Sequence, residues 1–82
     1  MMKVKVLLFA QARQIVGQES VEVTVESGCT VADLKQSLAD AYPDLESLLS
    51  RSSIALDQQY AVDSDIVNSD VEAAMIPPVS GG

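Results

Sequence analysis

Residues 21–41 read VEVTVESGCTVADLKQSLADA, and the architecture of the domain follows from this segment. In residues 21–26, valine alternates with polar side chains, a pattern that predicts a β-strand with one face in the core. A turn follows at Ser27 and Gly28. In residues 31–41, apolar side chains recur at the spacing of one helical stripe. The segment therefore predicts a strand followed directly by an amphipathic helix.

The predicted helix carries signals at both ends. Thr30 and Asp33 have the spacing of a capping box, with aspartate in place of the usual glutamate or glutamine. Pro43 predicts the end of the helix, because a proline pushes the residue before it out of the α conformation. The stripe expected to face the core consists of Val31, Leu34, Leu38, and Ala41 or Tyr42.

Shorter elements are predicted on both sides of this segment. Residues 3–9 alternate as a strand, and residues 10–16 favour a short helix that ends at Gly17. After the main helix we expect a turn of helix over residues 44–49 that covers a sheet edge. Three strands should follow, over residues 54–57, 60–62 and 71–76. The order predicts an α+β domain in which one main helix packs across a mixed sheet of four to five strands.

Strand alternation also assigns side chains to faces. Core-facing positions are expected at Val4, Val6 and Leu8 in the first strand and at Val71, Ala73 and Met75 in the last. The opposite face then receives Lys3, Lys5, Leu7 and Phe9 from the first strand and Ala74 and Ile76 from the last. Phe9 and Ile76 are therefore expected to be exposed apolar residues.

Composition excludes several classes of function. The 82 residues include twelve acidic and five basic side chains, a net charge of −7, with no basic cluster that could follow a phosphate backbone. No apolar run approaches the roughly 18 residues that span a bilayer. Without histidine, neither a His-activated nucleophile nor a His-containing zinc site is available. We therefore expect a cytoplasmic protein that binds neither nucleic acid nor membrane and holds no metal.

Cys29 is the only cysteine, so the chain cannot form an internal disulfide. The residue stands between Gly28 and Thr30, with no neighbouring cation that would lower the pKa of its thiol. We interpret Cys29 as a small, partly buried residue with a structural role, in a chain suited to a reducing compartment.

The sequence ends in Ile76-Pro77-Pro78-Val79-Ser80-Gly81-Gly82, which holds two of the four glycines. The prolines fix φ and favour an extended segment, which lowers the entropy lost on binding. Glycines have no Cβ atom, so this end could enter a channel too narrow for side chains. We therefore expect a domain over residues 1–76 and an extended tail over residues 77–82 that presents the α-carboxylate of Gly82.

The opening run over residues 6–13 with Gly17, together with the closing run over residues 76–82, resembles the small subunit of molybdopterin synthase. That family consists of ubiquitin-like sulfur carriers with the β-grasp fold. The resemblance implies that an ATP-dependent activating enzyme adenylates Gly82, and that sulfur supplied through a donor protein converts it to a thiocarboxylate. The large subunit, which carries the catalytic side chains, would then receive that sulfur for a cyclic pyranopterin precursor. No cofactor is expected on this chain itself.

Docking on these partners is expected to use a hydrophobic patch near the tail. The patch would comprise Phe9, Ile76, Pro77, Pro78 and Val79, followed by Ser80 and by Gly81, which leaves the route to Gly82 open.

One segment and one single residue depart from the family pattern. Residues 68–74 replace the usual Gly-Asp-Glu-Val-Ala, and we expect Asn68 to supply the turn through a positive φ. Asp57 stands where the family often has asparagine. Both departures concern local turn geometry.

Three other functions remain open. The chain could be a sulfur carrier for thiamine thiazole synthesis, although those carriers lack the Pro-Pro-Val-Ser segment. It could be a ubiquitin-like modifier that is attached to lysines through Gly82, or an interaction module whose tail has no chemical role.

Overall fold

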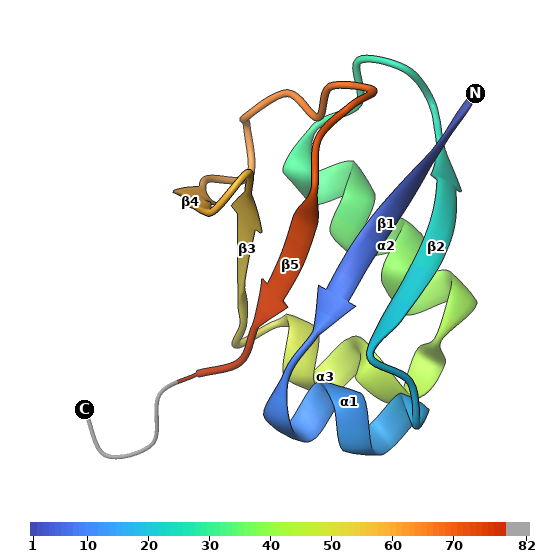
Figure 1. The fold of residues 1–82 in the computed structure, drawn as a ribbon, viewed down its shortest axis with the longest axis vertical. Coiled ribbons are helices and arrows are strands. Elements are labelled where there is room, and N and C mark those ends of the chain that lie inside the picture. The colour runs from blue at the N-terminus through green and yellow to red at the C-terminus, as the bar shows by residue number, and fades with distance from the viewer. Residues whose placement is uncertain (79–82) are drawn as a thin grey trace.

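A parallel pair of strands joins the two halves of the sequence. In the computed structural model, which describes residues 1–78, strand β1 (Met2–Leu8) lies beside strand β5 (Ala73–Ile76), with Leu7 opposite Ala74 (Figure 1). The full sheet has the order β2-β1-β5-β3-β4, and every other pair of neighbours is antiparallel. The predicted mixed sheet is therefore confirmed, with five strands.

The elements follow one another as the sequence pattern predicts, with bounds shifted by one or two residues. Between β1 and β5 come α1 (Ala10–Val16), β2 (Ser20–Val25), α2 (Val31–Ala41), the 3₁₀ turn η1 (Pro43–Leu45), α3 (Glu46–Leu49), β3 (Ser53–Leu56) and β4 (Gln59–Ala61).

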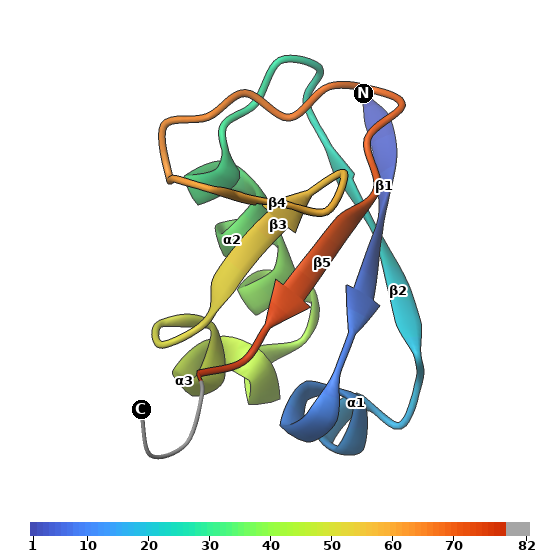
Figure 2. The same cartoon turned by 60° about the vertical axis from the view of Figure 1, so that its left-hand side comes forward.

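Helix α2 covers one face of the sheet, and no helix of the described chain covers the other (Figure 2). The predicted core-facing residues of β1 and β5 are buried, and so are Val31, Leu34 and Leu38 of α2. Tyr42 completes the helix stripe, because it packs against the core whereas Ala41 is exposed. Val71 precedes β5 and is only partly buried, so the last strand is shorter than predicted.

The start of α2 is held by its own cap and by a distant loop. The Thr30 N–H donates to Oδ2 of Asp33 and the Asp33 N–H donates to Oγ1 of Thr30, which confirms the capping box. The next two amides, of Val31 and Ala32, donate to the carbonyl oxygens of Asp65 and Asp63. The loop before β5 thus satisfies helix N–H groups that would otherwise lack partners.

The predicted helical turn after Pro43 exists as η1 and α3. It lies beside α1, beneath the ends of the strands, and not along an edge strand as the sequence suggested (Figures 1 and 2). Leu45, Leu48 and Leu49 are buried there, so this short segment closes one end of the core.

Turn geometry agrees with the sequence at Gly17 and differs at Asn68. Gly17 adopts φ 80° at the end of α1, as expected. Within residues 1–78 the non-glycine residues with positive φ are Ala10, Asp57 and Gln58, so the prediction for Asn68 is wrong. The turn there is closed by a hydrogen bond from the Val71 N–H to the Asn68 carbonyl oxygen, which right-handed residues can form.

Gln58→Gly should stabilise the protein. Asp57 and Gln58 form the two-residue loop between β3 and β4, with φ of 50° and 71°, and glycine adopts a positive φ without the steric cost that glutamine incurs. We expect a gain of about 1 kcal/mol, equivalent to a rise in Tm of roughly 4–8 °C, in thermal unfolding followed by circular dichroism.

Gln59→Gly is the matched control, because Gln59 lies in β4 and glycine weakens strands. The interpretation fails if both variants lower Tm alike.

Candidate functional site

The uncovered face of the sheet contains a groove of about 300 Å³. Its lining is mainly apolar and comes from β1, β3, β4, β5 and the residues next to them. The lining residues are Leu7, Phe9, Ala55, Gln58, Tyr60, Glu72, Ala74 and Ile76.

Strand register explains why this face is hollow. Leu7 lies opposite Ala74, Ala74 opposite Ala55, and Ala55 opposite Tyr60, so the four residues form a row across four strands. Two alanines in the middle of the row form a low floor between a leucine and a tyrosine. The depression is therefore built from small side chains between large ones.

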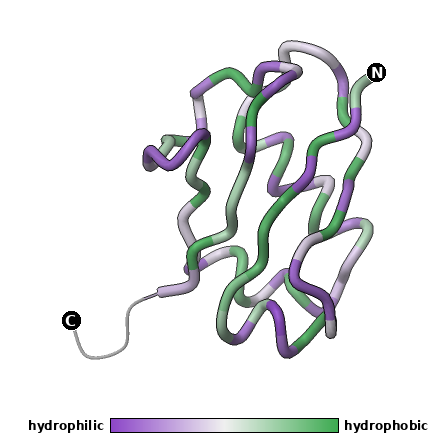
Figure 3. Tube along the Cα trace, in the orientation of Figure 1, coloured by the Kyte–Doolittle hydropathy of each residue, from purple (hydrophilic) through white to green (hydrophobic). Residues whose placement is uncertain are grey.

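Exposed aromatic rings border the floor. Phe9 directly follows β1 and is 43% exposed, and Tyr60 in β4 is 75% exposed. Figure 3 shows that the second half of β1 is hydrophobic over consecutive residues, whereas its first half alternates. Consecutive apolar residues supply both faces of the sheet, since Leu8 enters the core while Leu7 lines the groove.

The structure brings two of the predicted site residues together, because Phe9 and Ile76 line the same groove. Pro77 is partly buried and Pro78 is exposed, and neither lines the groove. Val79, Ser80, Gly81 and Gly82 lie outside the described residues, so their roles stay predictions.

The sequence predicted two of the eight lining residues, Phe9 and Ile76, as site residues. Alternation had already placed Leu7 and Ala74 on this face. Ala55 and Tyr60 could not be assigned to it in the same way, because the pairing of Ala55 with Ala74 and of Tyr60 with Ala55 depends on the order of the strands.

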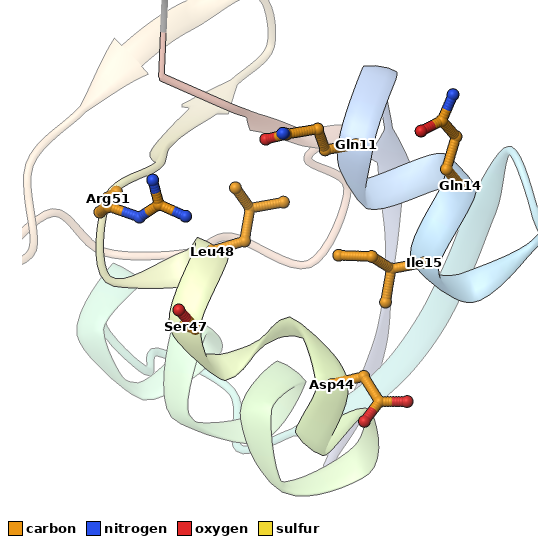
Figure 4. A pocket seen from close by; sticks show the side chains of 7 residues that line it. All are labelled: Gln11, Gln14, Ile15, Asp44, Ser47, Leu48 and Arg51. Carbon is orange, nitrogen blue, oxygen red and sulfur yellow. The ribbon is translucent and has the colours of Figure 1, made fainter.

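A second hollow, of about 380 Å³, lies between α1 and α3 (Figure 4). Ile15 and Leu48 point toward each other across it, and Arg51 reaches toward Leu48 from the other side. Asp44, Ser47, Gln11 and Gln14 complete the lining. The only carboxylate in this lining is that of Asp44, so the lining holds no pair of carboxylates suited to acid–base chemistry.

Cys29 is buried, more fully than the partial burial predicted, and its backbone forms hydrogen bonds at both its N–H and its carbonyl oxygen. Its N–H donates to the Glu26 carbonyl oxygen, and its carbonyl oxygen accepts from the Val67 N–H at 2.8 Å. Burial raises the pKa of the Cys29 thiol, and the negative charges of Asp33 and Glu26 raise it further. A thiol kept neutral is a poor nucleophile, which supports a structural role.

Cys29 should therefore resist alkylation in the folded protein. We expect iodoacetamide at mildly alkaline pH to modify the native chain far more slowly than the urea-unfolded chain, as followed by mass spectrometry. The thiol pKa is higher in the folded state, so the unfolded chain loses the Cys29 proton first as pH rises. The free energy of unfolding should therefore be at its full value below the unfolded-state thiol pKa of about 8.5 and should fall as pH rises above it.

Cys29→Ala is the control for the pH effect, since it should remove that alkaline loss of stability. Equal alkylation rates for native and unfolded chains would contradict the assignment.

None of the helices in residues 1–78 is long and apolar enough to cross a membrane. No group of three or more acidic or cysteine side chains in that range is placed to hold a metal ion.

Comparison with known proteins gives consistent matches. The model of the ThiS family matches residues 6–82. The molybdopterin synthase sulfur carrier subunit of Arabidopsis thaliana is 40% identical over 80 residues, which cover 98% of this chain and 83% of the relative.

Solved structures share the fold. Small archaeal modifier protein 1 of Haloferax volcanii is 26% identical with a TM-score of 0.86, covering 96% of this chain and 100% of that one. In the complex of subunits 1 and 2 of the molybdopterin-converting factor from Helicobacter pylori, one chain matches at 20% identity and a TM-score of 0.68, covering 99% of this chain and 100% of that one. The expected ubiquitin-like β-grasp fold is confirmed.

Proposed function

The chain belongs to the ThiS family, and from this membership we propose that it is a sulfur carrier for molybdopterin synthesis. The observation that carries the proposal is that the family match continues through residue 82 and so includes the Gly81-Gly82 ending. The Arabidopsis relative, which is named a molybdopterin synthase sulfur carrier subunit, supports the choice among sulfur-carrier functions.

The proposed chemistry takes place at the Gly82 carboxylate. At neutral pH this group is an anion that resists nucleophilic attack. An activating enzyme would use ATP to form an acyl-adenylate with release of pyrophosphate, and sulfide-level sulfur supplied through a donor protein would then displace AMP. The sulfur of the resulting thiocarboxylate would form a bond to a cyclic pyranopterin precursor, and hydrolysis of the acyl–sulfur bond would leave the sulfur on the precursor and return the Gly82 carboxylate. The activating enzyme uses ATP, and this chain would hold no cofactor.

The domain would provide the surface to which the partner proteins bind. Ile76 lines the groove and is also the last residue of β5, so a protein that occupies the groove sits beside the start of the tail. Residues 77–82 can extend roughly 18–20 Å, enough to reach a deep active site. Catalytic side chains would lie on the large subunit of molybdopterin synthase, with both proteins in the cytoplasm.

Within the tail, each residue type has a proposed use. Pro77 and Pro78 limit the entropy lost when the tail is threaded, and Val79 and Ser80 would line the entrance of the partner's channel. Gly81 presents no side chain next to the reacting carbonyl of Gly82.

Intact mass spectrometry tests the chemistry. When the chain is incubated with its activating enzyme, ATP and a sulfur source, we expect a mass increase equal to the replacement of one oxygen by sulfur, located at Gly82. The chain without Gly82 serves as the control and should gain no sulfur. A full-length chain that also gains none, while an established carrier does under the same conditions, would overturn the proposal.

Ala74→Arg tests the groove. An arginine on the groove floor should fill the site and weaken binding to the large subunit by about tenfold or more, measured by calorimetry. Val62→Arg is the matched control, because Val62 is apolar and 64% exposed but does not line the groove. If both variants bind the large subunit as tightly as the wild type does, the large subunit docks on a surface other than the groove.

A modifier function is the second candidate, because small archaeal modifier protein 1 shares the fold at a TM-score of 0.86. Attachment to proteins would leave Gly-Gly remnants on cellular lysines.

Complementation of strains that require molybdenum cofactor or thiamine separates the two sulfur-carrier functions.

A further inference from the structure

A side chain closes the last rung of the ladder between β3 and β5. Leu56 lies opposite Ala73, so the next pair in the antiparallel register is Asp57 and Glu72. The Asp57 N–H donates to the Glu72 carbonyl oxygen at 2.9 Å, as in a regular ladder. The return bond differs, because the Glu72 N–H donates to Oδ1 of Asp57, also at 2.9 Å.

The backbone of Asp57 explains this exchange of acceptors. Asp57 is the first residue of the loop between β3 and β4 and has a φ of 50°, whereas strand residues lie near −140°. A left-handed residue turns its carbonyl group away from the neighbouring strand, and the carboxylate takes its place as acceptor. Aspartate suits the position because its short polar side chain tolerates this conformation and bonds locally.

Both hydrogen bonds join Asp57 to the backbone of Glu72, which lies just before β5 and has no other regular strand pairing. Within residues 1–78, Glu72 is the only charged residue that lines the groove. Gln58, the neighbour of Asp57 in the loop, lines the same end. The Asp57 rung therefore holds the one charged wall of an otherwise mainly apolar groove.

We propose that Asp57 is a positioning residue for partner docking. By closing the rung it holds the Glu72 carboxylate beside the apolar floor. There the carboxylate selects a partner segment that inserts an apolar side chain with a lysine or arginine next to it. This inference rests on the proposed function, since it concerns the surface that would bind the large subunit. The net charge of −7 favours the same kind of partner, with association that weakens as salt rises.

Two substitutions separate the acceptor from the charge. Asp57→Asn keeps an oxygen acceptor and tolerates positive φ but removes the charge, whereas Asp57→Gly keeps the backbone conformation and removes the acceptor. Hydrogen exchange of the isolated chain, followed by NMR, should show a Glu72 amide protected in the wild type and in Asp57→Asn. In Asp57→Gly that amide should exchange about tenfold faster or more.

Binding to the large subunit tests the consequence. By calorimetry we expect Asp57→Asn to bind within about twofold of the wild type, and Asp57→Gly to bind roughly five- to tenfold more weakly. Glu72→Gln should weaken binding to a similar degree and reduce its salt dependence. In the double variant, Asp57→Gly should add little to the effect of Glu72→Gln, because the first residue acts through the second.

Several results would overturn the inference. Glu72 exchange that does not change in Asp57→Gly shows that the rung does not hold Glu72. If Asp57→Asn binds as weakly as Asp57→Gly, the loss of binding is due to the charge of Asp57. If the losses add in the double variant, Asp57 affects binding through the structure in general and not through Glu72. If Glu72→Gln binds as tightly as the wild type, the partner presents no lysine or arginine to the Glu72 carboxylate. A wild-type chain that does not bind the large subunit overturns the proposed function as well.

Discussion

The pairing of β1 with β5 is the interaction on which this fold and its groove are built. It joins a strand that starts at Met2 to one that ends at Ile76, and it is the single parallel pair in the described sheet. Leu8 and Met75 face each other in register on the core side, while Leu7 and Ala74 do so on the open side. One set of backbone hydrogen bonds therefore sets both the centre of the core and the floor of the groove.

The two faces of this pair have different physical tasks. On the inner face, α2 and the loop that caps it bury valine and leucine side chains, and this burial supplies most of the stability. On the outer face, Ala55 and Ala74 leave space that larger residues would fill. Alanine there gives up little packing while it creates a recess that another protein can occupy.

The described domain holds little reactive chemistry of its own. Cys29 is buried with a raised thiol pKa, and the second hollow between α1 and α3 is lined by a single carboxylate, that of Asp44. Such a domain suits a role in recognition, and under the proposed function the reaction would take place at the Gly82 carboxylate after a partner has activated it. Ile76 lines the groove and directly precedes Pro77, so under the proposed function a partner bound in the groove would lie next to the start of the tail that it receives.

Local patterns in the sequence were sufficient for the strands, the main helix, its capping box and the faces occupied by Leu7, Phe9, Ala74 and Ile76. These features depend on periodicity and on contacts between near neighbours, which one sequence displays. The row from Leu7 to Tyr60 and the bond from Glu72 to Asp57 depend on strand order, which brings together residues far apart in the chain. Alternation states which face a side chain occupies, but only the folded sheet determines which side chain lies next to it.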